Sequence, residues 1–179
     1  MRRRILPASS ALAALALASC VSAPPRPAPV APAPPPPPPA PVTAPAPAPL
    51  ADDWRDWPLT PGTWRYAPDS RGTRAMFGAG GDALVVLRCD RAERRMYLSR
   101  TGTAVAPFTV RTSSVSRAVA VHPTGGSLPY VAAALATSDP LLDAMAFSRG
   151  RFVIQQQGAS TLVIPAYAEV GRVIEDCRG

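Results

Sequence analysis

The segment from Val21 to Leu50 cannot build a hydrophobic core, because proline and alanine dominate it. It holds 15 of the 24 prolines of the chain, among them the unbroken run from Pro34 to Pro39. Proline fixes φ and has no amide hydrogen to donate, so the run favours an extended polyproline II conformation. We predict a disordered tether over residues 20–50 that reaches roughly 90 Å at about 3.1 Å per residue. The alternative is a proline-rich ligand for a groove-binding partner, a class of partner that is mainly intracellular.

The first 19 residues have the layout of a bacterial lipoprotein signal peptide. Three arginines at positions 2–4 precede an apolar run of about ten residues, Ala8 to Ala18, which is too short to span a bilayer. The motif Leu17-Ala18-Ser19-Cys20 resembles a lipobox. The resemblance implies that Cys20 is lipidated and becomes the first residue of an anchored protein. Each buried acyl methylene stabilises such an anchor by about 0.8 kcal/mol.

The residues after Cys20 bear on the destination of the protein. Val21 at this position, in place of Asp, resembles an outer-membrane sorting signal, which places the domain in the periplasm. The alternative is ordinary secretory cleavage after Ala23, because Val21-Ser22-Ala23 fits a small-x-small site. That cleavage would remove Cys20 altogether.

Residues 51–179 are enough for one globular domain with its own core. The formal charge of +7 includes three leader arginines, so the mature chain carries about +4. All 19 basic residues are arginine, and the absence of lysine excludes Ser-Lys catalysis. The mild charge and the export signal argue against nucleic acid as a partner.

Hydrophobic patterning predicts mostly strands in this domain. The segment Ala83–Cys89 is apolar on both faces, as a central strand is, and Arg94–Arg100 returns beside it. Further strands are predicted near 64–67, 74–78, 108–112, 117–121, 152–156 and 161–164. The segment Val131–Leu135 fits strand or helix, and we favour strand.

Two helices are predicted in the last third of the domain. Asp139 as N-cap and Pro140 at the first position begin one, with Leu141, Leu142, Met145 and Ala146 on its apolar face and Gly150 as its stop. The other covers Ala166–Cys177. The expected fold class is α+β dominated by β, an antiparallel twisted sheet or small sandwich with two packed helices, the second C-terminal.

Cys89 and Cys177 are the two cysteines that follow the proposed lipidation site. Cys89 shares a strand face with Val85 and Leu87, and Cys177 shares a helix face with apolar residues, so both point toward one core. An exported location permits oxidation, and we predict that they form a disulfide. Two separate buried thiols are the alternative. No Cys-x-x-Cys spacing suggests a redox role.

Few residues suit catalysis. His122 is the only histidine, which excludes a multi-histidine zinc site, and its position before Pro123 favours a loop residue. A triad with Ser113 or Ser127 lacks a nucleophile-elbow motif. The glycines of 78–81 have no following lysine, so we interpret them as a turn and not as a phosphate cradle. We expect no cofactor and no metal.

Aromatic and charged residues offer possible contacts with a ligand or partner. Trp54, Trp57, Trp64 and Tyr66 gather near the start of the domain, where we expect them to close one end of the core; stacking on a glycan is the alternative. Asp52, Asp53 and Asp56 lie beside them, and paired carboxylates of this kind serve glycoside hydrolysis when they lie close in space. Five arginines surround the first hairpin, and strand alternation predicts that they do not share a face. They are Arg88, Arg91, Arg94, Arg95 and Arg100, of which Arg91 and Arg95 are candidate contacts.

The C-terminal third resembles envelope proteins of the invasion-associated locus B type. The resemblance rests on Leu141-Leu142-Asp143-Ala144-Met145, Arg151-Phe152-Val153-Ile154, Thr161-Leu162-Val163-Ile164-Pro165 and the final Cys177. The chain has Pro165-Ala166-Tyr167 where that family has Gly-Phe. The resemblance implies a non-catalytic, β-rich envelope domain and no functional residue. The layout also resembles uncharacterised envelope lipoproteins.

Two functional hypotheses follow from these features. The first is a non-enzymatic binding or envelope-assembly module that is anchored to the outer membrane and contacts an envelope protein, lipopolysaccharide or peptidoglycan. The second is a hydrolase of envelope glycan or peptidoglycan. A deep cleft that brings together Asp52, Asp56, Glu93 or His122 would favour the hydrolase, and a shallow surface would count against it.

Overall fold

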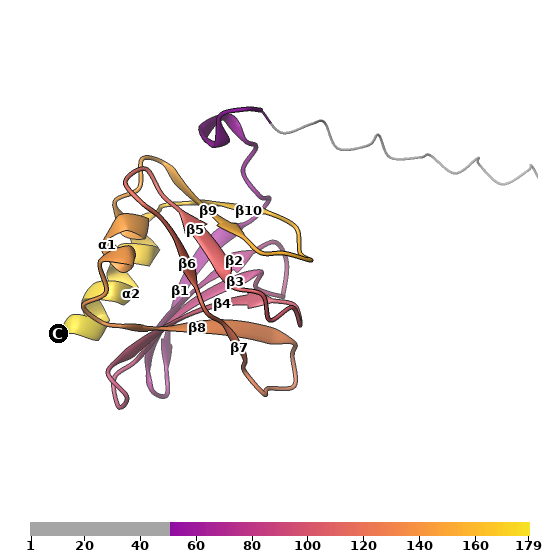
Figure 1. Cartoon of the computed structure of the whole chain (residues 1–179). Coiled ribbons are helices and arrows are strands. Elements are labelled where there is room, and N and C mark those ends of the chain that lie inside the picture. The colour runs from indigo at the N-terminus through magenta and orange to yellow at the C-terminus, as the bar shows by residue number, and fades with distance from the viewer. Residues whose placement is uncertain (1–50) are drawn as a thin grey trace, which may run out of the picture. The chain divides into compact units, whose positions relative to one another are not determined.

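The structure, a computed structural model, describes residues 51–179, so the leader, Cys20 and the proline-rich segment lie outside the described residues. A short 3-10 helix, η1 (Trp54–Asp56), comes first. The strands follow as β1 (Thr63–Asp69), β2 (Gly72–Gly78), β3 (Val85–Asp90), β4 (Arg95–Thr101), β5 (Phe108–Arg111), β6 (Ser116–Val119), β7 (His122–Pro123), β8 (Tyr130–Ala136), β9 (Arg151–Gln155) and β10 (Leu162–Pro165). The helices are α1 (Pro140–Ala146), between β8 and β9, and α2 (Ala168–Arg178), at the C-terminus (Figure 1).

The strands form two antiparallel sheets around one core. Sheet A has the order β1-β2-β3-β4-β8-β7, and sheet B has the order β10-β9-β5-β6. The chain leaves sheet A after β4, builds β5 and β6 of sheet B, and returns to sheet A with β7 and β8 (Figure 1). The predicted class is confirmed: a β-dominated α+β fold with two helices, the second C-terminal.

Alternation along the strands decides which side chains enter the core. β8 pairs with β4 over its whole length, from Arg95↔Ala136 to Thr101↔Tyr130, so the ambiguous segment is a strand. In β3 and β8 every second side chain faces inward and is buried. These inward residues are Val85, Leu87, Cys89, Val131, Ala133 and Leu135. The core therefore takes one face of each strand and leaves the other face of sheet A outside.

The two helices pack against each other and close the core on one side (Figure 1). Asp139 caps α1 as predicted, because its Oδ1 accepts a hydrogen bond from the backbone N–H of Leu141 at 2.9 Å. α2 lies against β1–β4, and its apolar face enters the same core as both sheets. Each fully buried aliphatic side chain contributes about 1.5–3 kcal/mol. Among residues 51–179, no helix has the length and apolar character that a membrane crossing needs.

Cys89 and Cys177 connect sheet A to α2. Their sulfur atoms are 2.15 Å apart, which is disulfide distance, although 88 residues separate them in sequence. Cys89 is fully buried near the end of β3, and Cys177 lies in the last turn of α2. This is the pair that we predicted from the apolar residues that share a face with each cysteine.

Two connections show what the sequence predicted well and what it missed. The glycines of 78–81 form the turn between β2 and β3, where Gly80 adopts a φ of 77° and its carbonyl oxygen accepts a hydrogen bond from Arg65 at 3.0 Å. His122, expected in a loop, instead forms the two-residue strand β7 with Pro123. β7 lies at the edge of sheet A, where a proline is tolerated because no ladder hydrogen bond needs its nitrogen.

Candidate binding groove

Two rows of side chains cross the outer face of sheet A, the face turned away from the core. Residues that pair across antiparallel strands point to the same side of a sheet. One row runs through Met76, Val86, Ser99, Ala132 and His122, and the next through Arg74, Arg88, Tyr97 and Ala134. The residues of β8 in these rows, Ala132 and Ala134, have short side chains. The side chains of the neighbouring strands β4 and β7 extend further from the sheet.

This arrangement leaves a groove of about 330 Å³ on sheet A. We call it the sheet A groove, and its lining residues are Arg71, Arg88, Asp90, Tyr97, Ser99, His122, Pro123, Thr124, Ala132 and Ala134. The volume suits a small ligand or one unit of a polymer. A hollow of about 430 Å³ beside the β9–β10 turn is lined by alanine, proline, threonine and glutamine and carries no charged group. The sheet A groove, in contrast, is lined by charged, hydroxyl and aromatic side chains that can bind a ligand.

Ion pairs neutralise the charged wall of the sheet A groove. Arg71 bridges the buried carboxylate of Asp90 and the exposed carboxylate of Glu93, with 2.7 Å between its Nη2 and Glu93 Oε1. Arg88 Nη2 lies 2.6 Å from Asp69 Oδ1. These charges balance one another, so the wall presents N–H and O–H groups with little net charge.

Hydrogen bonds fix the protonation states of two groups in this wall. Burial acts to raise the pKa of Asp69, but hydrogen bonds from the Arg71 backbone N–H and from Arg88 outweigh it and lower the pKa. The Tyr97 hydroxyl donates to Glu93, and this hydrogen bond, with burial and the Glu93 charge, raises the pKa of Tyr97. Both shifts move the pKa away from neutrality, so the hydrogen bonds favour the ionised form of Asp69 and the protonated form of Tyr97.

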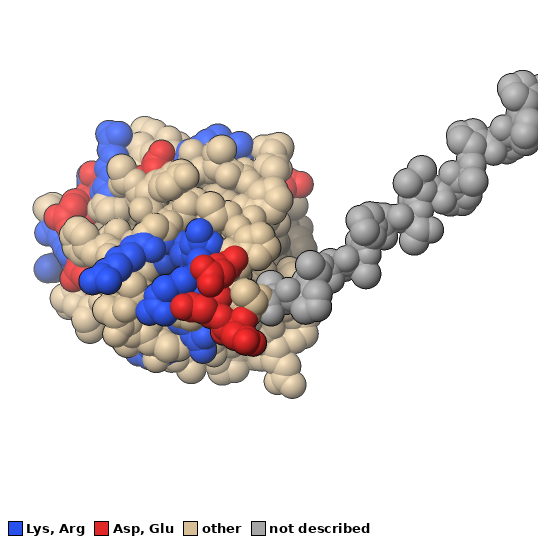
Figure 2. Space-filling model, turned by 90° about the horizontal axis from the view of Figure 1, so that it is seen from above, with Lys and Arg blue, Asp and Glu red and all other residues tan. Residues whose placement is uncertain are grey.

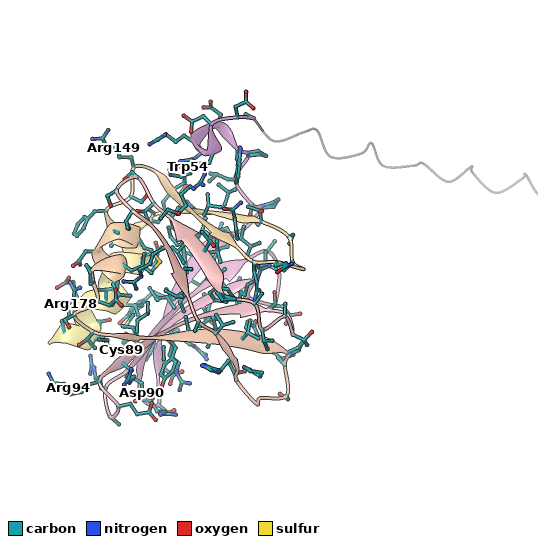
Figure 3. The ribbon with its side chains drawn as sticks, viewed as in Figure 1. Trp54, Cys89, Asp90, Arg94, Arg149 and Arg178 are labelled. Carbon is teal, nitrogen blue, oxygen red and sulfur yellow. A yellow bond between two sulfur atoms is a disulfide. The ribbon has the colours of Figure 1, made fainter. Side chains whose placement is uncertain are left out.

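The carboxylates considered for hydrolysis do not come together with His122. His122 lines the groove, whereas Glu93 is not a lining residue and is engaged in hydrogen bonds with Tyr97 and Arg71. Asp56 ends η1 and Asp52 lies just before its N-cap, and Figure 3 shows Trp54, in η1, and Asp90 at opposite ends of the domain. Two strand spacings, about 9 to 10 Å, separate Ser99 from His122 in their row, too far for the hydrogen bond of a catalytic pair.

Metal binding finds no support in the described part of the chain. Across residues 51–179, no three or more His, Cys, Asp or Glu side chains cluster closely enough to hold an ion.

The tryptophans near the start of the domain occupy two separate places. Trp64 is buried in the core, where its ring packs on Phe77 at 5.4 Å between centroids and its Nε1 donates to the Pro165 carbonyl oxygen at 2.8 Å. Trp54 is 8% exposed and covers Val153 and Val163 on the outer face of sheet B. The expectation that these rings together close one end of the core is wrong, because Trp64 and Trp54 belong to separate hydrophobic clusters.

The separation arises because the chain passes around the edge strand β10. The Thr60 N–H donates to the Val163 carbonyl oxygen, and Thr60 Oγ1 accepts from the Val163 N–H, both at 2.9 Å. Trp57, before this crossing, is half-buried beside Trp54. Of the three tryptophans proposed as contacts, Trp57 is therefore the one with a partly accessible ring.

The arginines of the first hairpin are distributed over several surfaces, as alternation predicts. Arg88 lines the sheet A groove, whereas Arg91 donates to the Asp176 carbonyl oxygen at 3.2 Å beside the C-terminus of α2. Arg95 is exposed at the start of β4, and Arg100 is buried. On the face shown in Figure 2, a group of basic side chains lies directly beside a group of acidic ones.

The sequence did not single out Tyr97, Ser99, Thr124, Ala132 and Ala134. The alanines at positions 132, 134 and 136 were the available sign, because every second residue of a strand lies on the same face and alanine side chains are short. No family model, curated protein or solved structure matches the chain. Its site is therefore interpreted from its own residues.

Proposed function

We propose that the protein is a lipoprotein, anchored to the outer membrane through Cys20, whose periplasmic domain binds an envelope glycan in the sheet A groove without catalysing a reaction. The leader and the lipobox-like motif support the anchor. The proline-rich tether supports a domain that works at a distance from its membrane. The groove supports the choice of ligand.

One observation carries the choice of a glycan: the charged groups of the groove already pair with one another. A charged ligand would have to compete with the contacts among Arg71, Asp90 and Glu93. A neutral, hydroxyl-rich ligand can accept from the arginines and donate to Ser99 or Thr124 while these pairs persist. The alanine floor and the flat side chains of Tyr97 and His122 suit a sugar ring.

The groove favours binding over hydrolysis of such a ligand. A glycosidase places two carboxyl groups about 5 to 9.5 Å apart on either side of the scissile bond. Asp90 is the one carboxylate that lines the groove, and it is 1% exposed and paired with Arg71. It is poorly placed to donate a proton to a leaving group.

Sedimentation with purified peptidoglycan sacculi tests the binding proposal. Ala134→Arg fills the groove, whereas Ala136→Arg puts the same side chain on the same strand outside the lining residues. We expect the first variant of the full chain to bind at least about tenfold more weakly and the second to bind within about twofold of wild type. Equal binding by all three proteins would overturn the proposal.

Metabolic labelling with palmitate tests the anchor separately. Wild type should incorporate the label and fractionate with the outer membrane, whereas Cys20→Ser should lose the label and become soluble in the periplasm. Secretory cleavage after Ala23 predicts no label in either protein, and that result would contradict the anchor.

A further inference from the structure

Arg100 is a buried cation in the core-facing row of β4. It pairs across the sheet with Val85 and Val131, both fully buried, and is itself only 3% exposed. The neighbouring residue Ser99 points the other way, into the sheet A groove. Arg100 therefore belongs to a different surface from the proposed glycan site, and the inference drawn from it does not depend on that site.

The hydrogen-bonding capacity of Arg100 is mostly unused. Its Nη2 donates to the Ser160 carbonyl oxygen at 3.0 Å, while Nε and Nη1 are buried without a partner. Within residues 51–179, no Asp or Glu approaches its guanidinium to ion-pair distance, in contrast to Arg71 in the β1–β2 turn and Arg88 on β3. A guanidinium stays charged at neutral pH, so burying it without a counter-charge is costly.

Two turns meet at the end of β4 where Arg100 lies. The β9–β10 turn supplies the Ser160 carbonyl oxygen, and the loop 102–107 follows directly on β4. Gln156, which is 7% exposed, ties this loop to the end of β9, because its Nε2 donates to the carbonyl oxygens of Ala104 and Ala106 at 2.7 and 2.8 Å. The loop is thus held by a side chain at Ala104 and Ala106, and at its start by the Gly102 N–H, which donates to the Pro129 carbonyl oxygen at 2.8 Å.

Residues of these turns line two hollows that open to solvent. One, of about 430 Å³, includes Gln156 and Thr161, and another, of about 230 Å³, includes Gly102 and Val131. Ser160 adjoins the first and Val131 pairs with Arg100 at the second. Arg100 lines neither hollow, so a small ligand reaches it only if the loop 102–107 shifts.

We propose that Arg100 binds an oxyanion, a carboxylate or phosphate group, at the end of β4 beneath the loop 102–107. The negative charge supplies the missing counter-charge, and its oxygens accept from the Nε and Nη1 groups that have no protein partner. The Ser160 carbonyl oxygen keeps Nη2 in place. The ligand is a free anion or the anionic end of a larger molecule that enters between the two turns.

Thermal unfolding of the full chain in matched salts tests the proposal. Sodium phosphate and sodium acetate are each titrated against sodium chloride at equal ionic strength. A ligand that binds the native state alone raises Tm in a saturable way. We expect such a rise with at least one of the two oxyanions; the active probe identifies the group as phosphate or carboxylate. Changes equal to those in chloride would overturn the proposal.

Two variants assign the effect to Arg100. Arg100→Met should lose the saturable rise, whereas Arg111→Met, on β5 of sheet B, should keep it. A rise that persists in Arg100→Met would contradict the assignment.

A second measurement on wild type avoids dependence on a variant that fails to fold. With 15N-labelled arginine, one buried side-chain Nε–H resonance should shift saturably with the active anion. If every arginine Nε–H resonance stays fixed throughout both titrations, water alone satisfies Arg100 and the proposal is wrong.

Discussion

The outer faces of the two sheets differ: one is covered by another segment of the chain and the other is open to solvent. On sheet B, valines point outward from β9 and β10, and Trp54 covers them. On sheet A, the outward residues of β8 are alanines, paired charged groups lie beside them, and a groove remains. We call the covering segment, residues 54–60, the N-terminal strap.

The difference shows that side-chain chemistry decides which face needs cover. Burying apolar surface stabilises a fold by about 25 cal/mol per Å². The strap therefore stabilises this fold by covering Val153 and Val163, which would otherwise be exposed to water. The outward alanines of β8 expose little apolar area, and the arginines beside them stay hydrated. Sheet A can therefore keep its outer face free for a ligand.

Removing the Cys89–Cys177 pair should have the largest effect, because it anchors sheet A to α2 from inside. We expect Cys89→Ala with Cys177→Ala to lose about 4 to 5 kcal/mol of unfolding free energy, measured by urea denaturation, since the pair closes a loop spanning 88 residues. Reductant should destabilise wild type and leave the double variant unchanged. Free-thiol labelling of unfolded, unreduced wild type would contradict the disulfide if both cysteines react.

Removing the strap residue should come next. Trp54→Ala should cost about 3 kcal/mol, because it uncovers Val153 and Val163 and leaves a cavity. Trp57→Ala is the matched control and should cost less, since its ring is only half-buried. Equal costs for both variants would mean that the strap is not held by Trp54.

Asp69→Asn tests the ion-paired wall of the sheet A groove. The folded pKa of Asp69 is lowered, so its contribution is fully present above the unfolded value of about 3.9 and is lost as pH falls through the folded pKa. We expect the variant to be less stable by about 1.5 to 3 kcal/mol at pH 7, the range for hydrogen bonds to charged groups. In urea denaturation at a series of pH values, this difference should shrink below pH 4. A gap that stays constant down to pH 2 would argue against the ion pairs.

Groove-filling should have the smallest effect on stability. Ala134 is exposed, so Ala134→Arg should change the unfolding free energy by less than about 0.5 kcal/mol, as should Ala136→Arg. Urea denaturation of both variants checks this. A large loss in Ala134→Arg alone would show that the open face carries a structural role.

Local sequence patterns predicted most of the fold. The apolar run of 83–89 and the Asp139 cap are short-range features, and each decides one element on its own. The segment 131–135 fitted strand or helix, and its pairing with β4 makes it a strand. The pairing of Cys89 with Cys177 followed from two apolar faces that needed a common core.

The rest depended on contacts between distant segments. His122 becomes a strand residue only because Ala132 lies beside it, and Trp54 parts from Trp64 because the chain crosses β10 between them. The groove combines side chains from the β1–β2 turn and from β3, β4, β7 and β8. No window of sequence contains that combination, so the groove could not be predicted.

Photo-crosslinking in cells tests the central claim that the open face of sheet A is the binding face. A photoreactive residue is placed at position 134 on sheet A or at position 109 on the outer face of sheet B. We predict adducts from position 134 alone, and a glycan-cleaving muramidase should remove them. Muramidase-sensitive adducts from position 109 and none from position 134 would contradict the account.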